Sequence, residues 1–579
     1  MKPLSAVADD VRPAEPALRP SDPDSLTTEA LVNCLVREVS MPERQVWPHG
    51  PYLLIRLARV GRLLRVRQRR QSAGVGPRLT GDVAELRDGW WRRIGWDGLA
   101  AVIAEELSLC TGNENDEFAA QVMASHAAIS AVTASDSPQV QPVASGELLR
   151  MDEHDLPILR YVASEQALVA GHRFHPAPKA RQGRPADWLR YAPEAGAGFP
   201  LRFLAVRADV VAEEGDPSEL DRLGPAPPEG FRLLPAHPWQ LSMLEGQPQL
   251  EAAMAAGLLR DLGHGSHHVV PTSSVRTVYD PAADVFCKFS LDVRITNCVR
   301  RSAWYELTGA ATLTRLLRPV FAKIAALFPG TVLLNEPGYR TARLASRRCF
   351  EGLAVIVRDG FRGHLRPAVT PLLAAALTEP RATLFDGRDA GWLLNWWEAY
   401  VTRVAPPALH AYLADGVVLE PHLQNVLIGI DDAGLPAQVI FRDLEGVKLL
   451  GDRHGAALAQ LPARVAEALA YDSERGWNRV VYCLVVNHLA ELAAAIADRH
   501  VGLEADLWRC AGSVLHRYGR SHGCPAPLRA LLAGVPLPAK ANLRTRWARA
   551  ADRYATYVHV QNPLGGLEQA SSFSAPWAR

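Results

Sequence analysis

The sequence predicts an α+β protein built from two or three sub-domains. At 579 residues the chain is longer than one hydrophobic core usually accommodates. Strand-type segments separated by turn residues gather in the middle of the chain, whereas helical spacing dominates after about residue 351. The middle strands are expected at 201–206, 274–279 and 285–291, and one further strand pair at 417–430 and 437–443. This order of elements favours α+β over a doubly wound sheet.

Composition is that of an ordinary globular protein and excludes some functions. Hydrophobic residues make up 48% and charged residues 22%, and the formal net charge is +1. A nearly neutral chain does not bind nucleic acid or a membrane surface through bulk charge, so we expect neither partner. Eight scattered cysteines without a C-x-x-C pair are typical of reduced thiols, which predicts a cytoplasmic protein.

The N-terminal end of the chain and its most apolar run fit this interpretation. Residues 1–25 are rich in Pro and Asp and have no apolar signal segment, so we expect a disordered tail. The apolar run Val480–Ala497 contains Asn487, His488 and Glu491. These polar residues favour a buried helix over a membrane span.

From Leu26 to about Ala170, helical stretches alternate with one predicted β-hairpin. Apolar residues at 55, 57, 64 and 66 alternate with arginines around a turn near Gly61. Seven arginines between Arg56 and Arg70 would suit an anion patch. A solvated strand face explains them more simply.

A second predicted hairpin runs from Pro271 to Leu291. Pairing outward from a turn at 281–283 places Arg276 opposite Lys288 and Ser274 opposite Ser290. Two cations across a strand pair repel by a few tenths to about 1 kcal/mol, a cost removed by an anion between them. A phosphate group suits the pair, because Arg offers a planar fork and Lys a point charge. A surface ladder with both side chains in water is an equal alternative on this hairpin alone.

Two further segments carry phosphate-type side chains. Asn297 and Arg300 are three residues apart before a predicted helix, and on a helical face they would add an amide and a guanidinium to the same site. The Pro-rich loop 171–183 presents His172, His175, Lys179 and Arg181 as phosphate contacts. The two histidines lack further nearby ligands for a zinc site.

His237 lies in a similar rigid loop, Pro235–Gln240, where a structural and a catalytic role are equally open.

An acidic strand pair is predicted at Leu419–Ile428 and Val439–Gly446. Glu420, His422 and Gln424 would share one strand face, with Asp443 folded back opposite His422. The carboxylates of Glu420 and Asp443, with amide oxygens of Gln424 or Asn425, are the hard ligands that Mg²⁺ prefers. The chain has neither a P-loop nor a G-x-G-x-x-G motif, so a nucleotide must be held in another way.

In this order the motifs resemble the IucA/IucC family of NRPS-independent siderophore synthetases. The motifs that match are Gly171–Gly183, His237–Gln240, Pro271–Thr277, Lys288–Arg300, Glu420–Asn425 and Arg442–Asp443. The resemblance implies a hand-like fold with a thumb at 26–170, fingers at 171–350 whose antiparallel sheet binds ATP, and a mostly helical palm at 351–579. Arg173 departs from the family's usual proline, which affects the rigidity of the histidine loop.

By matching positions, the resemblance also assigns roles. Ser274, Arg276, Thr277, Lys288, Asn297 and Lys179 would hold ATP, and His172 or His175 its phosphates. Arg300 and His422 would contact the substrate carboxylate and the α-phosphate. Glu420 and Asp443, with Gln424 or Asn425, would bind Mg²⁺.

The activity that the resemblance implies is a two-step ligation. A polycarboxylate, with citrate as the leading candidate and 2-oxoglutarate or a half-amide as alternatives, would be adenylated by ATP and then joined to an amine or hydroxyl. The family is usually homodimeric. A kinase of the aminoglycoside-phosphotransferase type is the alternative suggested by His422, Asn425 and Asp443, but the chain lacks a Gly-rich phosphate loop. A non-catalytic carboxylate-binding protein is a third interpretation.

Overall fold

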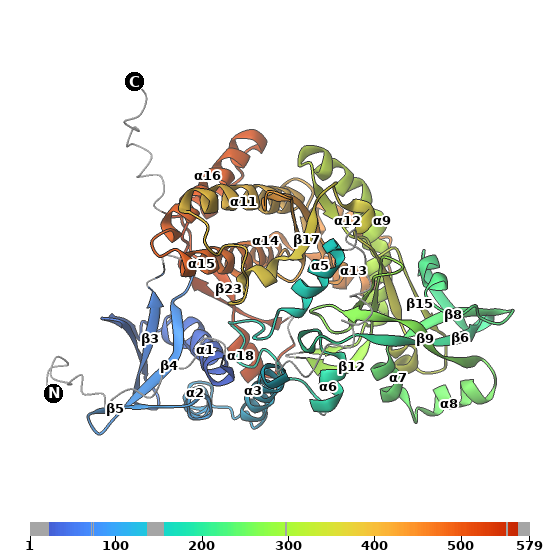
Figure 1. The fold of residues 1–579 in the computed structure, drawn as a ribbon, viewed down its shortest axis with the longest axis horizontal. Coiled ribbons are helices and arrows are strands. Elements are labelled where there is room, and N and C mark those ends of the chain that lie inside the picture. Colours follow the sequence, from blue (N-terminus) through green and yellow to red (C-terminus); the bar gives the residue numbers. More distant parts are fainter. Residues whose placement is uncertain are drawn as a thin grey trace.

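The computed structural model describes residues 22–135 and 156–565, except 71, 73, 74, 184, 296, 297, 552 and 553. The predicted tail at 1–25 lies mostly outside this range, and its last residues, from Pro23, already belong to helix α1. Figure 1 shows an N-terminal sheet at the left, a long central sheet at the right, and a helix-rich C-terminal part above and between them.

In the N-terminal part an antiparallel sheet, ordered β1-β2-β3-β4-β5, shares a core with helices α1 and α2. The elements are α1 (Pro23–Leu35), a π-helical turn (Val36–Ser40), β1 (Val46–His49), β2 (Tyr52–Leu57), β3 (Arg62–Arg70), β4 (Arg78–Arg87), β5 (Trp90–Arg93), α2 (Trp96–Thr111), α3 (Glu117–Ser135) and α5 (Leu156–Gln166). The predicted hairpin is confirmed, since Leu57 pairs with Arg62. Arg62 pairs with Glu85, and Arg65 lies over the ring of Tyr52, so surface contacts account for these two arginines, whereas the Arg70 side chain is buried and pairs with Asp498 at 2.8 Å.

A helix from the far end of the chain, α18 (Asn542–Trp547), completes this N-terminal core. Leu543 and Trp547 are buried among residues of α1 and α2. The Asn115 amide donates to the carbonyl oxygens of Arg546 and Trp547 at 3.2 and 2.8 Å, and the Leu543 N–H donates to the Glu38 carboxylate at 3.0 Å. The two ends of the described chain therefore share one core.

The central part is built on an eight-stranded sheet with the order β7-β15-β16-β11-β10-β9-β6-β8. Its elements are α6 (Pro185–Tyr191), β6 (Phe199–Arg207), β7 (Val211–Gly215), β8 (Phe231–Ala236), α7 (Pro238–Leu244), α8 (Pro248–Ala255), β9 (Leu259–Pro271), β10 (Thr277–Asp280), β11 (Val285–Phe289), β15 (Gly338–Ala342), α10 (Arg347–Gly352) and β16 (Val355–Asp359). Every neighbouring pair is antiparallel, as the sequence predicts.

The predicted register of the β10–β11 hairpin is wrong by one residue. Thr277, not Arg276, stands opposite Lys288, because four residues (281–284) rather than three separate the strands. Asp284 takes a positive φ of 52° in this loop, which lets the longer turn close. Arg276 therefore lies just before the strand, beside Lys288 rather than across from it.

The segment predicted to enter a helix at Asn297 and Arg300 forms a second hairpin. Strand β12 (Leu291–Ile295) pairs with β13 (Cys298–Arg300), and helix α9 (Trp304–Leu327) begins four residues after Arg300. The shared helical face of Asn297 and Arg300 is therefore wrong. Asn297 itself lies outside the described residues.

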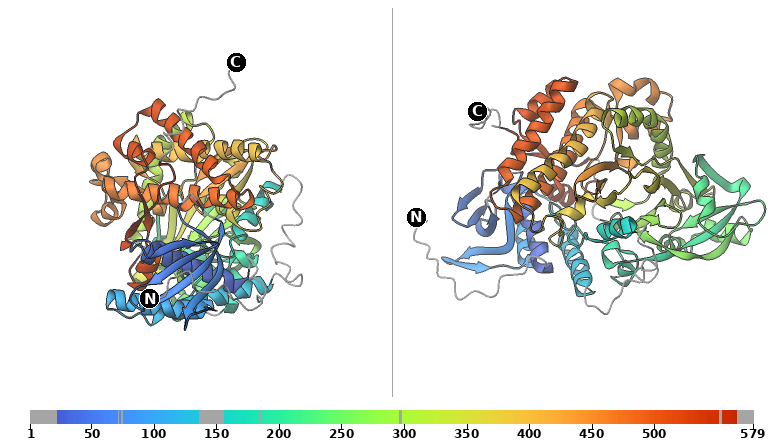
Figure 2. Two further views of the ribbon diagram at one scale, coloured as in Figure 1. Left: turned by 90° about the vertical axis from the view of Figure 1, so that its left-hand side faces the viewer. Right: turned by 45° about the horizontal axis from the view of Figure 1, so that its top comes forward.

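The C-terminal part surrounds a small mixed sheet, β14-β20-β19-β17, with long helices. Its elements are β14 (Thr331–Leu333), β17 (Thr370–Leu373), α11 (Ala390–Leu413), β18 (Val417–Val418), β19 (Val426–Ile430), β20 (Pro436–Phe441), β21 (Lys448–Leu450), α12 (Gly451–Leu458), α13 (Ala463–Leu469), β22 (Ala470–Tyr471), α14 (Ser473–Val481), α15 (Ala490–Arg499), α16 (Glu504–His522), α17 (Ala526–Leu532), β23 (Leu537–Lys540) and β24 (Tyr557–Val560). Helices α11, α15 and α16 pack together over this part (Figure 2).

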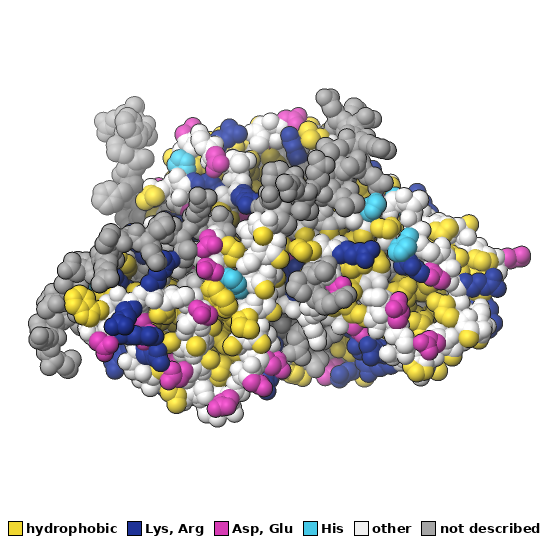
Figure 3. Space-filling view, turned by 60° about the horizontal axis from the view of Figure 1, so that its bottom comes forward, with side chains coloured by type: hydrophobic (Ala, Val, Ile, Leu, Met, Phe, Trp, Pro, Cys, Tyr) yellow, Lys and Arg dark blue, Asp and Glu magenta, His cyan; other side chains and the backbone are white. Residues whose placement is uncertain are grey.

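Among the described residues one helical stretch, Ser473–Arg499, is long and apolar enough to cross a membrane, and 89% of its apolar 18-residue window is buried inside the protein. A π-helical segment, Tyr482–Leu489, lies between α14 and α15. This agrees with the predicted buried helix. On the face shown in Figure 3, basic and acidic side chains are interspersed, as expected for a net charge of +1.

A buried ion pair joins helix α5, the central sheet and the C-terminal part beside the end of β20. The Arg442 guanidinium donates to the Glu165 carboxylate of α5, and to the carbonyl oxygen of Gln424 at 2.9 Å. The other Glu165 oxygen accepts the Ser273 N–H at 2.9 Å, from the turn before β10. Both side chains of the pair are at most 4% exposed, so neither charge has solvent to replace its partner.

The variant Glu165→Gln should lower the free energy of unfolding by about 3–5 kcal/mol, because it leaves the buried Arg442 charge unpaired. Equilibrium denaturation in urea measures this. The matched control is Glu398→Gln, since Glu398 pairs with Arg517 at 2.8 Å with both side chains about half exposed. That change should cost less than about 1 kcal/mol. Equal losses in the two variants would contradict the role given to Arg442 and Glu165.

Candidate active site

Basic residues of the central sheet meet acidic residues that follow β20. Lys288 of β11 donates to Asp443 at 2.5 Å and lies 2.9 Å from the Glu445 carboxylate. Arg276 donates to Glu445 and, at 2.9 Å, to the hydroxyl of Ser302. The structure thus brings together the two hairpins that the sequence predicts as phosphate and metal sites.

Two further residues complete this charge cluster. Arg358 of β16 lies 3.1 Å from Asp443 and 2.6 Å from Glu336, which also lies 3.8 Å from Lys288. Three cations therefore face three carboxylates. We define Arg276, Lys288, Arg358, Glu336, Asp443 and Glu445 as the central charge cluster. The sequence does not single out Glu336, Arg358 or Glu445, although Glu445 is only two residues from Asp443.

Burial and charge together set the protonation of the central charge cluster. Burial by itself would lower the pKa of Lys288, but Asp443, Glu336 and Glu445 raise it above its usual value. Burial would raise the pKa of Asp443, but Lys288 and Arg358 hold it well below its usual range. Lys288 is 2% exposed, whereas the Asp443 side chain is 32% exposed. The carboxylate side of the cluster is therefore the side that a ligand meets first.

The turn that carries Arg276 is shaped by its own hydroxyl groups. The Thr277 N–H donates to Ser274 Oγ at 3.2 Å, and Thr272 Oγ1 donates to the Thr277 carbonyl at 2.9 Å. Val275 takes a positive φ of 68°, which is strained for a β-branched residue. Ser274 and Thr277, predicted as nucleotide contacts, thus hold the turn that presents the Arg276 guanidinium.

Three histidines of the predicted site share one protonation pattern. The Nδ1 atoms of His172, His175 and His422 accept the backbone N–H two residues later, at 3.0, 3.1 and 3.3 Å. Because a backbone N–H only donates, each neutral ring carries its proton on Nε2 and offers that N–H outward. The pKa of His172 falls to about 3. Burial is the main cause, and the charges of His175, Arg37 and His422 act in the same direction. The loop 171–183, which carries His172 and His175, and the segment 420–425, which carries His422, therefore lie close together.

Ion pairs replace the missing proline in the histidine loop. Arg173 pairs with Glu29 of α1 and, at 3.2 Å, with Glu491 of α15. Its carbonyl oxygen accepts from Asn33 at 3.5 Å, and that of Phe174 accepts from Asn542 at 2.8 Å. The loop is thus fixed from both ends of the chain. Arg173 thus makes the loop rigid through ion pairs, where the family usually has a proline.

Lys179 has a partner inside the protein. Its ammonium donates to Glu194 at 3.0 Å, and Arg181 pairs with the same carboxylate oxygen. Burial would raise the pKa of Glu194, but Arg181 and Lys179 lower it to about 2. These contacts are enough to give Lys179, Arg181 and Glu194 a structural role. Nucleotide binding by Lys179 stays a prediction.

The acidic segment 420–425 is a turn rather than a strand. The His422 N–H bonds the Glu420 carbonyl at 2.8 Å, and the Asn425 N–H bonds the His422 carbonyl at 2.9 Å. The common strand face of Glu420, His422 and Gln424 is therefore wrong, because β19 begins only at Val426. The Gln424 carbonyl accepts Arg442, and the Asn425 side-chain amide donates to the Glu420 carbonyl at 3.3 Å.

The turn nevertheless leaves His422 under the influence of two carboxylate charges. Burial lowers the pKa of His422, while Glu420 and Asp443 act to raise it. Glu420 pairs with Arg479 at 3.0 Å. Behind the turn, the Pro421 carbonyl bonds His488 at 2.7 Å, and His488 bonds the Tyr400 hydroxyl at 2.5 Å. His488 lies in the π-helical segment 482–489, a kind of element that is frequent at functional sites.

Within the described residues, no group of three or more His, Cys, Asp and Glu side chains is arranged to hold a metal ion. Mg²⁺ bound with a nucleotide usually needs only one or two protein carboxylates, because phosphates and water fill the other positions. Glu420 and Asp443, whose charges both act on His422, are the candidates for that smaller requirement.

Arg300 differs from the other cations of this region. It is partly exposed on β13, and among the described residues it makes no hydrogen bond or ion pair. The next residue, Arg301, is held by Asp292 at 2.7 Å. Among the described residues, the Arg300 guanidinium is therefore available to a ligand.

His237 is structural. Its Nδ1 accepts the Trp239 N–H at 3.2 Å and caps α7, and its ring packs against Tyr191, Phe199 and Phe289. Burial alone lowers its pKa to about 3.

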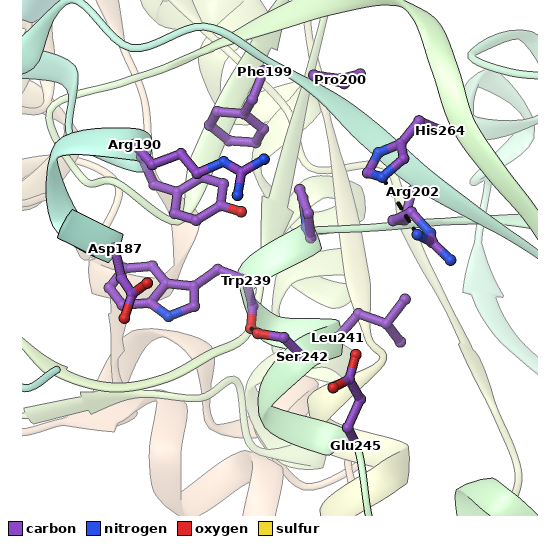
Figure 4. Close-up of a pocket in the computed structure, with 12 residues that line it drawn as sticks. Asp187, Arg190, Phe199, Pro200, Arg202, Trp239, Leu241, Ser242, Glu245 and His264 are labelled. Atoms are coloured by element: carbon purple, nitrogen blue, oxygen red, sulfur yellow. Dashed lines mark hydrogen bonds between the residues drawn. The ribbon is translucent and has the colours of Figure 1, made fainter. Parts of the chain in front are cut away.

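A cavity of about 290 Å³ lies near His237, between α6, α7 and the sheet, as Figure 4 shows. Trp239 and Phe199 line it and belong to the same core as Cys287 and Phe289. Lys288 lies between these two residues on β11, so its side chain points to the opposite face of the sheet. The cavity is therefore separate from the central charge cluster.

Comparison with known proteins identifies the family. The IucA/IucC family matches residues 160–379, and the family described as "Ferric iron reductase FhuF-like transporter" matches residues 394–555. The rhizobactin siderophore biosynthesis protein RhbC of Rhizobium meliloti is 31% identical over 449 residues, covering 71% of this chain and 76% of that protein. The L-2,3-diaminopropanoate–citrate ligase of Staphylococcus aureus is 31% identical, covering 70% and 75%.

The fold agrees with these matches. The ATP-bound aerobactin synthetase IucA of Klebsiella pneumoniae superposes with a TM-score of 0.81, at 23% identity, over 94% of this chain and 100% of that one. The chain belongs to the IucA/IucC family of siderophore synthetases, and it is an enzyme of the ligase class. The kinase and the non-catalytic binding protein are thereby set aside.

The variant Lys288→Met should shift acid unfolding to higher pH. Lys288 holds the Asp443 pKa below its ordinary value of about 3.9, so this carboxylate adds stability above about pH 4 that is lost as the pH falls. Without the ammonium, Asp443 is protonated at a higher pH. Circular dichroism between pH 2 and 7 measures the midpoint. Lys323→Met, at an exposed position, is the control. Coincident midpoints for Lys288→Met and the wild type would contradict the role of this bridge.

Proposed function

We propose that this synthetase activates citrate with ATP as an acyl-adenylate and joins it to an amine or hydroxyl. The observation that carries the proposal is the bridge from Lys288 to Asp443 and Glu445, which gathers phosphate-type cations and metal-type carboxylates at one place. Relatives named as citrate ligases support the substrate, including the diaminopropanoate–citrate ligase described above and a spermidine–citrate ligase of Bacillus anthracis.

The first step breaks the bond between the α- and β-phosphates. A citrate carboxylate oxygen attacks the α-phosphorus, an acyl-adenylate forms, and pyrophosphate leaves with the negative charge. Lys288 and Arg276 stabilise charge on the phosphates, and the Nε2–H groups of His172, His175 and His422 donate to phosphate oxygens. Holding the carboxylate in line with the α-phosphorus is worth up to about 7–11 kcal/mol in favourable cases.

The second step forms the amide or ester. The nitrogen or oxygen of the second substrate attacks the acyl carbon, the bond from that carbon to the AMP oxygen breaks, and AMP leaves. The proton of the nucleophile passes to solvent or to a neighbouring base. Arg300 is suited to the free carboxylates of citrate, because a guanidinium binds a carboxylate through two parallel hydrogen bonds.

Mg²⁺ belongs to this proposal as the ion that accompanies ATP. Glu420 and Asp443 would hold it, with Gln424, Asn425 and Glu445 as further oxygen donors nearby. When bound, the ion neutralises phosphate charge. Lys288 and Arg276 pair with the Asp443 and Glu445 carboxylates, so the protein itself compensates these charges.

The remaining expectations form part of the same proposal. ATP lies on the central sheet, in the fingers of a hand-like fold with thumb, fingers and palm near 26–170, 171–350 and 351–579. The enzyme is cytoplasmic and homodimeric, its ligands are the small carboxylate and its amine or hydroxyl partner, and it needs neither nucleic acid nor membrane.

Product analysis tests the reaction class. With ATP, Mg²⁺, citrate and a diamine or amino acid, the enzyme should release AMP and pyrophosphate in equal amounts, and hydroxylamine should trap the citryl group. A panel of 2-oxoglutarate, succinate and citrate half-amides identifies the acid. Release of ADP, or of no nucleotide product with any acid, would refute the proposal.

Arg300→Ala and His422→Ala should each reduce pyrophosphate release about 100-fold or more, the usual scale for removing one preorganised charge-stabilising donor. Both proteins should keep the far-ultraviolet spectrum of the wild type. Arg301→Ala is the neighbouring control, because Asp292 already engages that guanidinium. Normal pyrophosphate release by Arg300→Ala or His422→Ala would remove that residue from the mechanism.

A further inference from the structure

Arg37 is a buried cation that forms no ion pair of its own among the described residues. It lies in the π-helical turn Val36–Ser40 and is 4% exposed. Its Nε and Nη2 atoms are fully buried, and within the described part of the chain neither has a hydrogen-bond partner. The guanidinium instead lies over the ring of Phe174, 3.1 Å from its centre.

The acids near Arg37 are already engaged. Glu491 pairs with Arg173, and the Glu38 carboxylate accepts the N–H groups of Leu543 and Arg544 at 3.0 and 2.9 Å. Burial lowers the pKa of Arg37, and the charges of Glu491 and Glu38 offset only part of that shift. Buried polar groups nearly always have partners, and a buried unpaired charge costs several kcal/mol. A protein can keep a buried unpaired charge, despite this free-energy cost, when the missing partner is a ligand.

The position of Arg37 indicates what that ligand is. In the sequence, Phe174 lies between His172 and His175. The charge of Arg37 acts on both His172 and Tyr482. The Tyr482 hydroxyl lies 3.5 Å from His172 Nε2, the N–H that faces away from the loop backbone. Arg37 therefore stands beside the histidines assigned to phosphate contact, on the side supplied by the N-terminal part.

We infer that Arg37 is an oxyanion-binding residue of the active site, contributed by the N-terminal part of the chain. This inference rests on the proposed function and extends it to a residue outside the family motifs noted in the sequence. The oxyanion is either a phosphate of ATP that leaves in pyrophosphate or a carboxylate of the acid substrate. Both offer the same negatively charged oxygens to a guanidinium fork.

Opposite effects on stability and binding test the inference. Arg37→Met keeps the apolar stem over Phe174 and removes the unpaired charge, so the ligand-free variant should melt at the same temperature as the wild type or higher. Its affinity for the bound oxyanion should fall at least about tenfold, the scale of a charged hydrogen bond. Calorimetric titration of the full chain with ATP, inorganic pyrophosphate and citrate separates the sources. A loss confined to ATP and pyrophosphate identifies a phosphate, and a loss confined to citrate identifies a carboxylate.

Two further variants sharpen the result. Arg37→Lys keeps the charge without the fork and should lose less affinity than Arg37→Met. Arg340→Met is the matched control, since Arg340 is equally buried but paired with Glu213 and Asp221, so its loss should lower the melting temperature and leave the three affinities unchanged.

A lower melting temperature or loss of folding in Arg37→Met, or unchanged affinity for all three ligands, would overturn the inference. The titrations do not depend on turnover. Failure of the proposed reaction, seen as ADP formation by the wild type, is therefore distinguishable from failure of Arg37 to bind an oxyanion.

Discussion

The buried bridge from Lys288 to Asp443 and Glu445 is the interaction on which the rest of the site depends. An ammonium that is 2% exposed is tolerated only when nearby carboxylates compensate its charge. Here those carboxylates belong to the C-terminal part of the chain. The bridge therefore fixes the central sheet against the strand pair β19–β20. Because Asp443 and Glu445 are about one-third exposed, they keep the cluster accessible to a ligand while they neutralise it.

Two other junctions fix what surrounds the bridge. Arg442 and Glu165 hold the turn 272–277 and the turn 420–425 in one position, which sets Arg276 and His422 relative to each other. Arg173, held by Glu29 and Glu491, does the same for His172 and His175. All three junctions join residues more than a hundred positions apart. The site is thus preorganised by long-range ion pairs rather than by a single local motif.

The sequence predicts the elements of the site better than their geometry. The β10–β11 hairpin follows from its β-branched strands and Asp-Pro turn, but its register depends on one extra loop residue at Asp284, which residue preferences do not specify. The alternating polar residues at 420–424 suggest a strand, yet hydrogen bonds from Arg442 and His488 stabilise a turn there. Glu29, Glu336 and Arg358 lie in unremarkable local sequence, and only folding gives them partners. Arg37 also lies in unremarkable local sequence, and only the structure shows that it has no hydrogen-bond or ion-pair partner among the described residues.

The placement of α18 has a consequence for how the protein is made. Leu543 and Trp547 complete a core whose other members lie mainly between residues 31 and 122, and Glu38 receives its backbone partners only from Leu543 and Arg544. On the ribosome, the N-terminal sheet emerges more than four hundred residues before these groups. It must therefore wait, incompletely packed, until synthesis is nearly finished. Unlike chains whose domains fold one after another as they emerge, this one closes its first core last.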